Sequence, residues 1–151
     1  MKNPLLSSYS TPFESVPFEE IELKHFKPAF EQGIELAKAE IEAIKNSSEA
    51  PSFLNTFEAL ERSGKIIGNV SNVFFNLNGA ETSDEIQALA QEVSPLLTAY
   101  SNDIQMDTQL FERINTVYNS IDKSTLNDEQ LMLLEETYIS FVNNGANLSD
   151  K

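Results

Sequence analysis

The segment 53–78, FLNTFEALERSGKIIGNVSNVFFNLN, decides the fold class of this 151-residue chain. At about 100° per residue, its apolar positions fall on two neighbouring stripes of one predicted helix. The two stripes contain Phe53, Phe57, Leu60, Gly64, Ile67, Ser71 and Phe74, and then Ile66, Val70, Val73 and Leu77. Together they cover roughly half of the helix circumference, which is wider than the ~100° arc of an ordinary surface helix. A helix this apolar is expected to pack on two sides, inside a body of several helices.

The part of the chain before this segment divides into an arm and a helix. Residues 1–20 contain three prolines and no helical period, so they are predicted to form an extended arm that lies on a surface. A helix is predicted over 25–45, because Pro28 is tolerable only in a first turn, where its missing N–H costs nothing. Residues 46–51 are predicted to form a loop.

The part after the segment carries three further helical patterns. Thr82 and Glu85 match a capping box, and the helix that they open is predicted to continue to Ile104 as one bent helix with Pro95 on its solvent side. Two shorter helices are predicted after the caps Asp107 and Asn127. The last of them is predicted to stop at a left-handed Gly145.

No segment shows the sustained alternation of apolar and polar residues that a β-strand requires. The predicted fold is therefore all-α, with five or so helices in an antiparallel helical array and an extended N-terminal arm. The predicted domain organisation is the arm over 1–20 and one helical N-terminal domain over 21–151.

Composition excludes several classes of function. Twenty-four acidic against ten basic residues give a net charge of −14, which would repel a nucleic-acid backbone and modestly favour cationic ligands. No apolar run approaches the ~18 residues of a membrane helix. The N-terminus MKNPLLSSYS lacks the apolar core of a secretory signal, so a cytoplasmic location is expected, although a chain trimmed of its signal would look the same.

Catalytic chemistry finds no support among the residues of this chain. A zincin helix needs two histidines at i and i+4 with a glutamate between them, and the chain has the single histidine His25. Glu22 and His25 form one E-x-x-H, whereas di-iron bundles use two such pairs and two further glutamates. The chain has no cysteine to supply a thiolate. The expectation is that this chain holds no catalytic residue, no metal and no cofactor.

Two features of the 53–78 segment point to contacts beyond an ordinary core. Gly64 and Gly68 form a GxxxG, which predicts a close approach of two helices. Phe74 and Phe75 point about 100° apart, so one ring or the asparagine amides after it could line a cleft and touch a peptide backbone. The candidate channel-lining residues are Phe75, Asn76 and Asn78.

Four stretches of the chain closely resemble the N-terminal region of one peptidase family. They are NPLLSSYSTPFESVPFEEIELKHFKPAFEQGI (3–34), SFLNTFEALERSGKIIGNVSNVFFNLNGAET (52–82), LAQEVSPLLTAYSNDI (89–104) and LMLLEETYISFVNNGANLS (131–149). The family is that of the thimet-oligopeptidase zinc metallopeptidases, in its peptidyl-dipeptidase and oligopeptidase A branch. The resemblance covers essentially the whole chain, in order and at the right spacing.

The resemblance implies a function for the parent protein. Enzymes of this family are two-lobed and helical, with a narrow channel that admits short peptides, and they remove dipeptides from C-termini or cut oligopeptides. Their zinc motif would lie beyond residue 151, so this chain would supply wall or lid helices of the channel, and its partner would be the remainder of its own enzyme chain. The good N-cap Ser149 before Asp150 predicts that another helix begins there.

Composition and periodicity alone equally permit a free-standing acidic all-α protein-interaction module. A stop codon after Lys151 in the native reading frame would favour that alternative, and a continuing frame with H-E-x-x-H would favour the peptidase. If the chain is a piece of a larger helical enzyme, helix faces that pack on the rest of that enzyme would be exposed. Two sets of apolar residues are candidates for such a face. They are Ile66, Val70, Val73 and Leu77, or Met132 and Ile139. Self-association is predicted through such a face.

Overall fold

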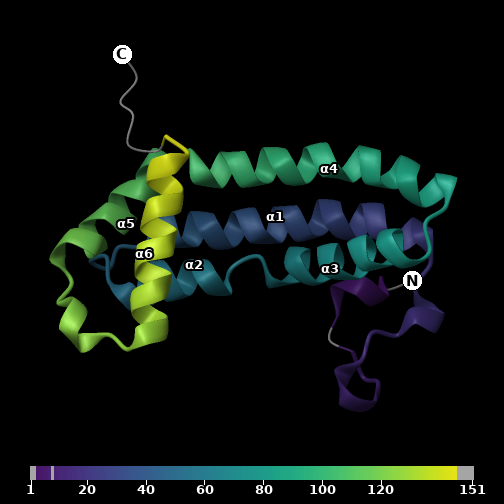
Figure 1. The fold of residues 1–151 in the computed structure, drawn as a ribbon, viewed down its shortest axis with the longest axis horizontal. Helices are drawn as coiled ribbons and strands as arrows, with labels where there is room; N and C mark the ends of the chain where they lie inside the picture. Colours follow the sequence, from purple (N-terminus) through teal and green to yellow (C-terminus); the bar gives the residue numbers. More distant parts are fainter. Residues whose placement is uncertain (1–2, 8, 146–151) are drawn as a thin grey trace. The chain divides into compact units, whose positions relative to one another are not determined.

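The computed structural model describes residues 3–7 and 9–145, and over these residues the chain forms helices and turns without a strand (Figure 1). The α-helices are α1 (Phe26–Lys45), α2 (Ala59–Arg62), α3 (Lys65–Ala80), α4 (Asp84–Gln105), α5 (Thr108–Ser120) and α6 (Asp128–Asn143). The predicted all-α fold is confirmed. Within the described part of the chain, no helix has both the length and the apolarity needed to cross a bilayer.

The contacts divide the chain into two compact units. Unit 1 contains the residues up to Ala39 together with 64–98, and unit 2 contains 40–63 together with the residues from Ala99 onward. Helices α1 and α4 therefore contribute residues to both units.

Unit 1 is built on the packing of α3 against α1. The Phe74 ring lies 5.1 Å from the ring of Phe26 and 5.5 Å from that of Phe30, measured between centroids. Gly33, which follows Phe30 in α1, faces Ile67, which precedes Phe74 in α3, so α1 and α3 run antiparallel. Val93 of α4 is fully buried, and the Lys27 ammonium lies 2.8 Å from the Glu92 carboxylate of α4.

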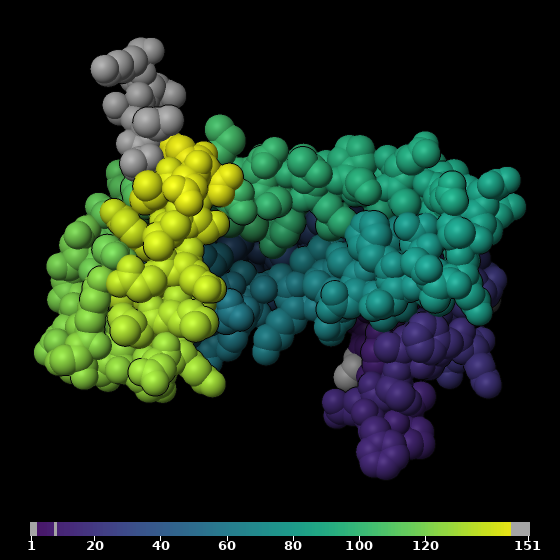
Figure 2. All heavy atoms as spheres, viewed as in Figure 1, coloured from purple at the N-terminus to yellow at the C-terminus, as the bar shows by residue number. Residues whose placement is uncertain are grey.

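The residues before α1 form a series of short 3-10 turns, η1 (Pro4–Leu6), η2 (Pro12–Glu14), η3 (Phe18–Glu20) and η4 (Leu23–His25). Turn η1 packs on α3 and buries Leu5, while the Asn3 amide donates a 2.7 Å hydrogen bond to the His25 carbonyl. The start of the arm thus lies on a surface, as expected. Figure 2 shows the later part of the arm, in purple, protruding from unit 1, and Phe13 in η2 is fully exposed.

Unit 2 surrounds a second core, whose buried members come from the end of α1, from the π-helical turn η5 (Phe53–Glu58) and from α5 and α6. They are Ile41, Ile44, Phe57, Leu110, Phe111, Ile114, Val117, Leu134 and Phe141. The Asp107 side chain caps α5, accepting a 2.8 Å hydrogen bond from the Leu110 N–H, and it also lies 2.7 Å from the Lys45 ammonium. The Lys45 ammonium pairs with the carboxylates of both Asp107 and Glu42. Hydrogen bonds to Asp107 and, to a lesser extent, to Glu42 raise the pKa of Lys45, so the lysine stays charged.

Arg113 of α5 is a buried cation that holds a loop of unit 2. Its side chain is only 8% exposed, and its guanidinium donates to the carbonyls of Ser47 and Glu49 and to the amide oxygen of Asn55. Ser47 and Glu49 belong to the loop between α1 and η5. Because these acceptors lie on irregular backbone, the arginine replaces the hydrogen bonds that a helix would supply.

The long helix predicted over 53–78 is wrong as a single element. The segment forms η5 and α2, stops at Ser63 and restarts as α3 after Gly64, which has a left-handed φ of 69°. Glycine adopts this conformation at no steric cost, so the backbone turns there. The apolar period continues across the break because periodicity counts residues and does not register a change of backbone direction.

The interpretation of the GxxxG as a close helix approach is also wrong. Gly64 is the left-handed residue at the break, and a Cβ at Gly68 would meet nothing within 4 Å. The close approach occurs instead at Gly33 of α1, where a Cβ would lie 3.4 Å from the Ile67 backbone and side chain.

The other helices begin and end close to the predicted positions. Helix α1 starts one residue after His25, Asp107 and Asn127 cap α5 and α6, and Gly145 has a positive φ of 86°. Helix α4 runs through Pro95 as a single helix, and that proline is exposed.

Two details of the predicted boundaries need correction. The N-cap of α4 is Ser83 and not Thr82, since the Ser83 hydroxyl accepts the Ile86 N–H at 3.2 Å. Helix α3 ends at Ala80, two residues beyond the predicted segment 53–78. The helix predicted to begin at Ser149 lies outside the described residues.

The two candidate sets of exposed apolar residues have different outcomes. Val70 and Val73 are buried in unit 1, so the first set is wrong as an exposed face. Met132 and Ile139 are 62% and 51% exposed, and their spacing of seven residues places them on one side of α6. The second set is confirmed as exposed.

Replacing Arg113 by alanine is expected to lower the free energy of unfolding by about 2–3 kcal/mol, because three acceptors lose a charged donor. Arg62→Ala is the matched control, since Arg62 pairs with Glu58 on an exposed helix surface. Its cost should stay below about 1 kcal/mol. Urea denaturation followed by circular dichroism measures both values, and equal losses would show that Arg113 does not hold the loop.

Leucine at the two mid-helix glycines should have opposite effects. Gly68→Leu is expected to stabilise the chain by up to about 0.8 kcal/mol, because leucine is the better helix former and the site is open. Gly33→Leu should destabilise it by about 1–3 kcal/mol, because the side chain would push α1 from α3. Thermal unfolding measures the pair, and a stabilised Gly33→Leu would contradict the close packing.

Candidate functional site

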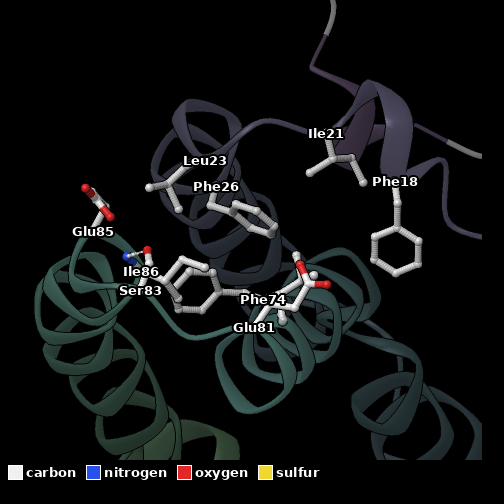
Figure 3. Close-up of a pocket in the computed structure, with 10 residues that line it drawn as sticks. Phe18, Ile21, Leu23, Phe26, Phe74, Glu81, Ser83, Glu85 and Ile86 are labelled. Atoms are coloured by element: carbon white, nitrogen blue, oxygen red, sulfur yellow. Dashed lines mark hydrogen bonds between the residues drawn. The ribbon is translucent and has the colours of Figure 1, made fainter.

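A largely apolar pocket of about 460 Å³ opens on unit 1 (Figure 3). It lies among three segments that are far apart in the sequence, namely the turns before α1, the end of α3 and the start of α4. Its lining consists of Phe18, Ile21, Leu23, Phe26, Phe74, Leu77, Glu81, Ser83, Glu85 and Ile86. Pockets of 300–1,000 Å³ lined by apolar side chains with a few polar groups are typical of small-ligand sites.

The core of unit 1 positions the apolar side of the pocket. Phe26 and Phe74, which pack against each other, present their rings to it, and the labelled side chains of Phe18 and Ile21 face it from the arm in Figure 3. Ile86 is placed by the cap of α4, because its N–H donates to the Ser83 hydroxyl. The pocket therefore depends on helix ends that local hydrogen bonds hold.

Two carboxylates are the charged groups of the lining, which contains no lysine, arginine or histidine. Hydrogen bonds from its own backbone N–H and then from the Ser83 hydroxyl lower the pKa of Glu85. Glu85 therefore stays ionised at neutral pH.

Glu81 lies at the C-terminal end of α3, where its N–H donates to the Leu77 carbonyl at 2.8 Å. In Figure 3 its side chain reaches over the pocket toward Ile21 and Phe18. A helix C-terminus carries about half a negative charge, and the last turn of α3 contains no basic residue to offset it. The carboxylate thus adds to an existing negative pole.

The candidate channel-lining residues lie next to this pocket in the sequence but outside its lining. Phe75 is 40% exposed and packs edge-on against Phe74 at 5.2 Å. The Asn76 side chain donates to the Asn72 carbonyl of its own helix at 2.7 Å. Asn78 is partly buried, and its amide oxygen has no hydrogen-bond partner. Their role in a channel stays a prediction.

The described residues contain no group of three or more His, Cys, Asp or Glu side chains that could hold a metal ion. His25 has a structural role, since its Nδ1 accepts the Glu22 N–H at 3.0 Å and completes a capping box on η4. The side chains described do not fit the donor set of the zinc site that the family resemblance implies.

Sequence reasoning did not find this pocket. Leu77 and Phe74 belong to the apolar stripes of the predicted helix. No local sequence pattern indicates that Glu81 or Phe18 lies close to either of them. The one available signal was the run of apolar residues Phe18, Ile21 and Leu23 before α1, which is unusual for a free arm.

No protein-family model matches the chain. Curated relatives do match it over nearly its whole length. The chain is 40% identical to a dipeptidyl carboxypeptidase of Salmonella typhimurium over 149 residues, which are 99% of this chain and 22% of the relative. It is 36% identical to a dipeptidyl carboxypeptidase of Escherichia coli over 97% of this chain and 22% of that protein.

An oligopeptidase A of Salmonella typhimurium is 25% identical over 98% of this chain and 21% of its own length. The chain thus spans about a fifth of the length of these relatives, in agreement with a match to one region of a larger protein. The predicted resemblance is confirmed, and this chain is a homologue of the dipeptidyl carboxypeptidase and oligopeptidase A peptidases over that region.

Proposed function

We propose that this chain is the non-catalytic, helical N-terminal part of a zinc-dependent oligopeptidase or peptidyl-dipeptidase that cleaves short peptides. In this proposal the parent enzyme removes dipeptides from peptide C-termini, and the chain forms part of the wall or lid of the substrate channel. Its partners are the remainder of its own enzyme chain and short peptide substrates. A cytoplasmic location stays a prediction.

The observation that carries the proposal is the identity of 40% with a dipeptidyl carboxypeptidase over almost the whole chain but only 22% of that relative. A match of this kind supports shared ancestry of one region and leaves most of the relative's length for other parts of the enzyme. Nucleic-acid binding has no support, because the chain carries a net charge of −14.

The non-catalytic role rests on the donor residues of the chain. Hydrolytic zinc sites use three protein ligands and keep one position open. A helix that supplies two histidines and a glutamate base cannot be drawn from a sequence with one histidine, and His25 is engaged in a cap. The zinc and its ligands are therefore assigned to other residues of the parent enzyme.

The experiment compares the 151-residue chain with the complete product of its gene. The complete protein should cleave a quenched peptide substrate in a zinc-dependent manner and release C-terminal dipeptides. The chain alone, with zinc added, should produce no turnover above buffer. Zinc-dependent cleavage by the purified chain alone, or a complete protein without peptidase activity, would overturn the proposal.

Asn76→Ala combined with Asn78→Ala in the complete enzyme should raise KM for a peptide substrate about five- to 150-fold with little change in kcat. Each amide would lose one hydrogen bond to the peptide backbone, worth about 0.5–1.5 kcal/mol. Steady-state kinetics measure both constants.

Asn119→Ala is the matched control for that double variant. The Asn119 amide also donates to a carbonyl four residues earlier on its own helix, as Asn76 does, but it lies on α5 in unit 2. Its KM should equal that of the unchanged enzyme. An unchanged KM in the Asn76 and Asn78 variant would remove these residues from the channel.

The exposed apolar pair Met132 and Ile139 supports the alternative of a free-standing acidic interaction module, since such a pair can serve as a contact for another helix. The native reading frame separates the two functions. A frame that continues into an H-E-x-x-H motif favours the peptidase, and a stop codon after Lys151 favours the module.

A further inference from the structure

The pocket of unit 1 combines apolar walls with a purely negative charge. Its apolar side is formed by aromatic and aliphatic residues such as Phe18, Phe26 and Phe74, and its only ionisable groups are Glu81 and Glu85. A volume of about 460 Å³ is enough for an aromatic or branched aliphatic side chain and part of its backbone.

The basic residues nearest in sequence to the lining are already paired. The Lys24 ammonium lies 2.8 Å from the Glu22 carboxylate, and the Lys27 ammonium lies 2.8 Å from that of Glu92. In the described part of the chain, neither of these two ammonium groups therefore forms an ion pair with the carboxylate of Glu81. The carboxylate of Glu81 lies at the negative end of the α3 dipole, where a negative charge is unfavourable and a cation is favoured.

We propose that this pocket binds peptide segments in which an apolar side chain stands next to a basic one. The apolar side chain enters the space between Phe18 and Phe74, and the basic side chain reaches the carboxylate of Glu81 at its edge. Charge complementarity selects this occupant, because an anionic or a neutral segment would leave the negative pole of α3 uncompensated.

This inference goes beyond the proposed function, because it assigns a ligand class to a pocket whose lining contains no metal donor set. Its test uses the 151-residue chain and requires no peptidase activity. A negative result would therefore leave the proposed function standing, and an inactive parent enzyme would leave the pocket's ligand class unaffected.

The probes are three blocked dipeptides that share one apolar group and differ in charge. They are N-acetyl-Phe-Lys-amide, N-acetyl-Phe-Gln-amide and N-acetyl-Phe-Glu-amide. Titration is followed by the amide resonances of Leu77 and Ile86 in two-dimensional NMR. The lysine peptide should bind about two- to five-fold more tightly than the glutamine peptide, as an exposed ion pair allows, and the glutamate peptide should bind most weakly.

Two variants separate the charge from the apolar contact. Glu81→Gln should bring the lysine and glutamine peptides to within about 1.5-fold of each other, whereas Phe18→Ala should weaken all three peptides by the same factor. Phe18 and Glu81 are both exposed, so neither change should unfold the chain, and circular dichroism checks this. Glu112→Gln is the matched control, since it removes one negative charge from α5 in unit 2 and should preserve the order of binding.

Equal binding of the three dipeptides, or a lysine preference that survives Glu81→Gln, would overturn the proposal. Shifts confined to resonances outside unit 1 would overturn it as well. A lysine preference that is lost in Glu81→Gln and kept in Glu112→Gln would support it.

Discussion

The packing of the Phe74 ring against Phe26 and Phe30 is the contact on which unit 1 depends. All three rings are buried, and Phe74 meets Phe30 at a right angle, the edge-to-face arrangement that aromatic pairs favour. Helices α1 and α3 can approach this closely because Gly33 has no side chain to separate them from Ile67. Two of the same rings form a wall of the pocket, so the site exists only where this core is formed.

The placement of the charged residues in this acidic chain leaves a negative charge beside the pocket. Several of its few cations serve structure: Lys27 and Lys45 pair with carboxylates on other elements, and Arg113 holds the loop before η5. Glu81 has none of these partners and lies at the end of a helix whose dipole repels it. A negative pole beside an apolar pocket is thus a consequence of where α3 ends.

The similarity to dipeptidyl carboxypeptidases and the helical architecture both support the role proposed above, that of a helical part of a larger peptidase. The helices pack through buried aromatic residues, and the described residues contain no group of three or more His, Cys, Asp or Glu side chains that could hold a metal ion. The proposed function therefore rests on similarity to relatives that are several times longer than this chain, and the structure adds a largely apolar pocket in unit 1.

Local features of the sequence predicted most helix ends. Asp107 and Asn127 cap α5 and α6 because their side-chain oxygens accept hydrogen bonds from backbone N–H groups three residues later. A contact over three residues can be predicted from the sequence alone. Pro95 inside α4 and the left-handed Gly145 follow equally local rules. The break at Gly64 could not be predicted in this way, since the apolar period of the segment continues through it.

By itself, the sequence determined that the chain is helical and acidic, where most of its helices begin, and which peptidases it resembles. Only the tertiary structure decided that Gly33 and not Gly68 allows close packing, and that Phe18, Phe74, Glu81 and Ile86 share one pocket. The physical reason is range. Caps and periodicity act within a few residues, whereas a pocket needs side chains from three distant segments whose proximity is created by the burial of the core.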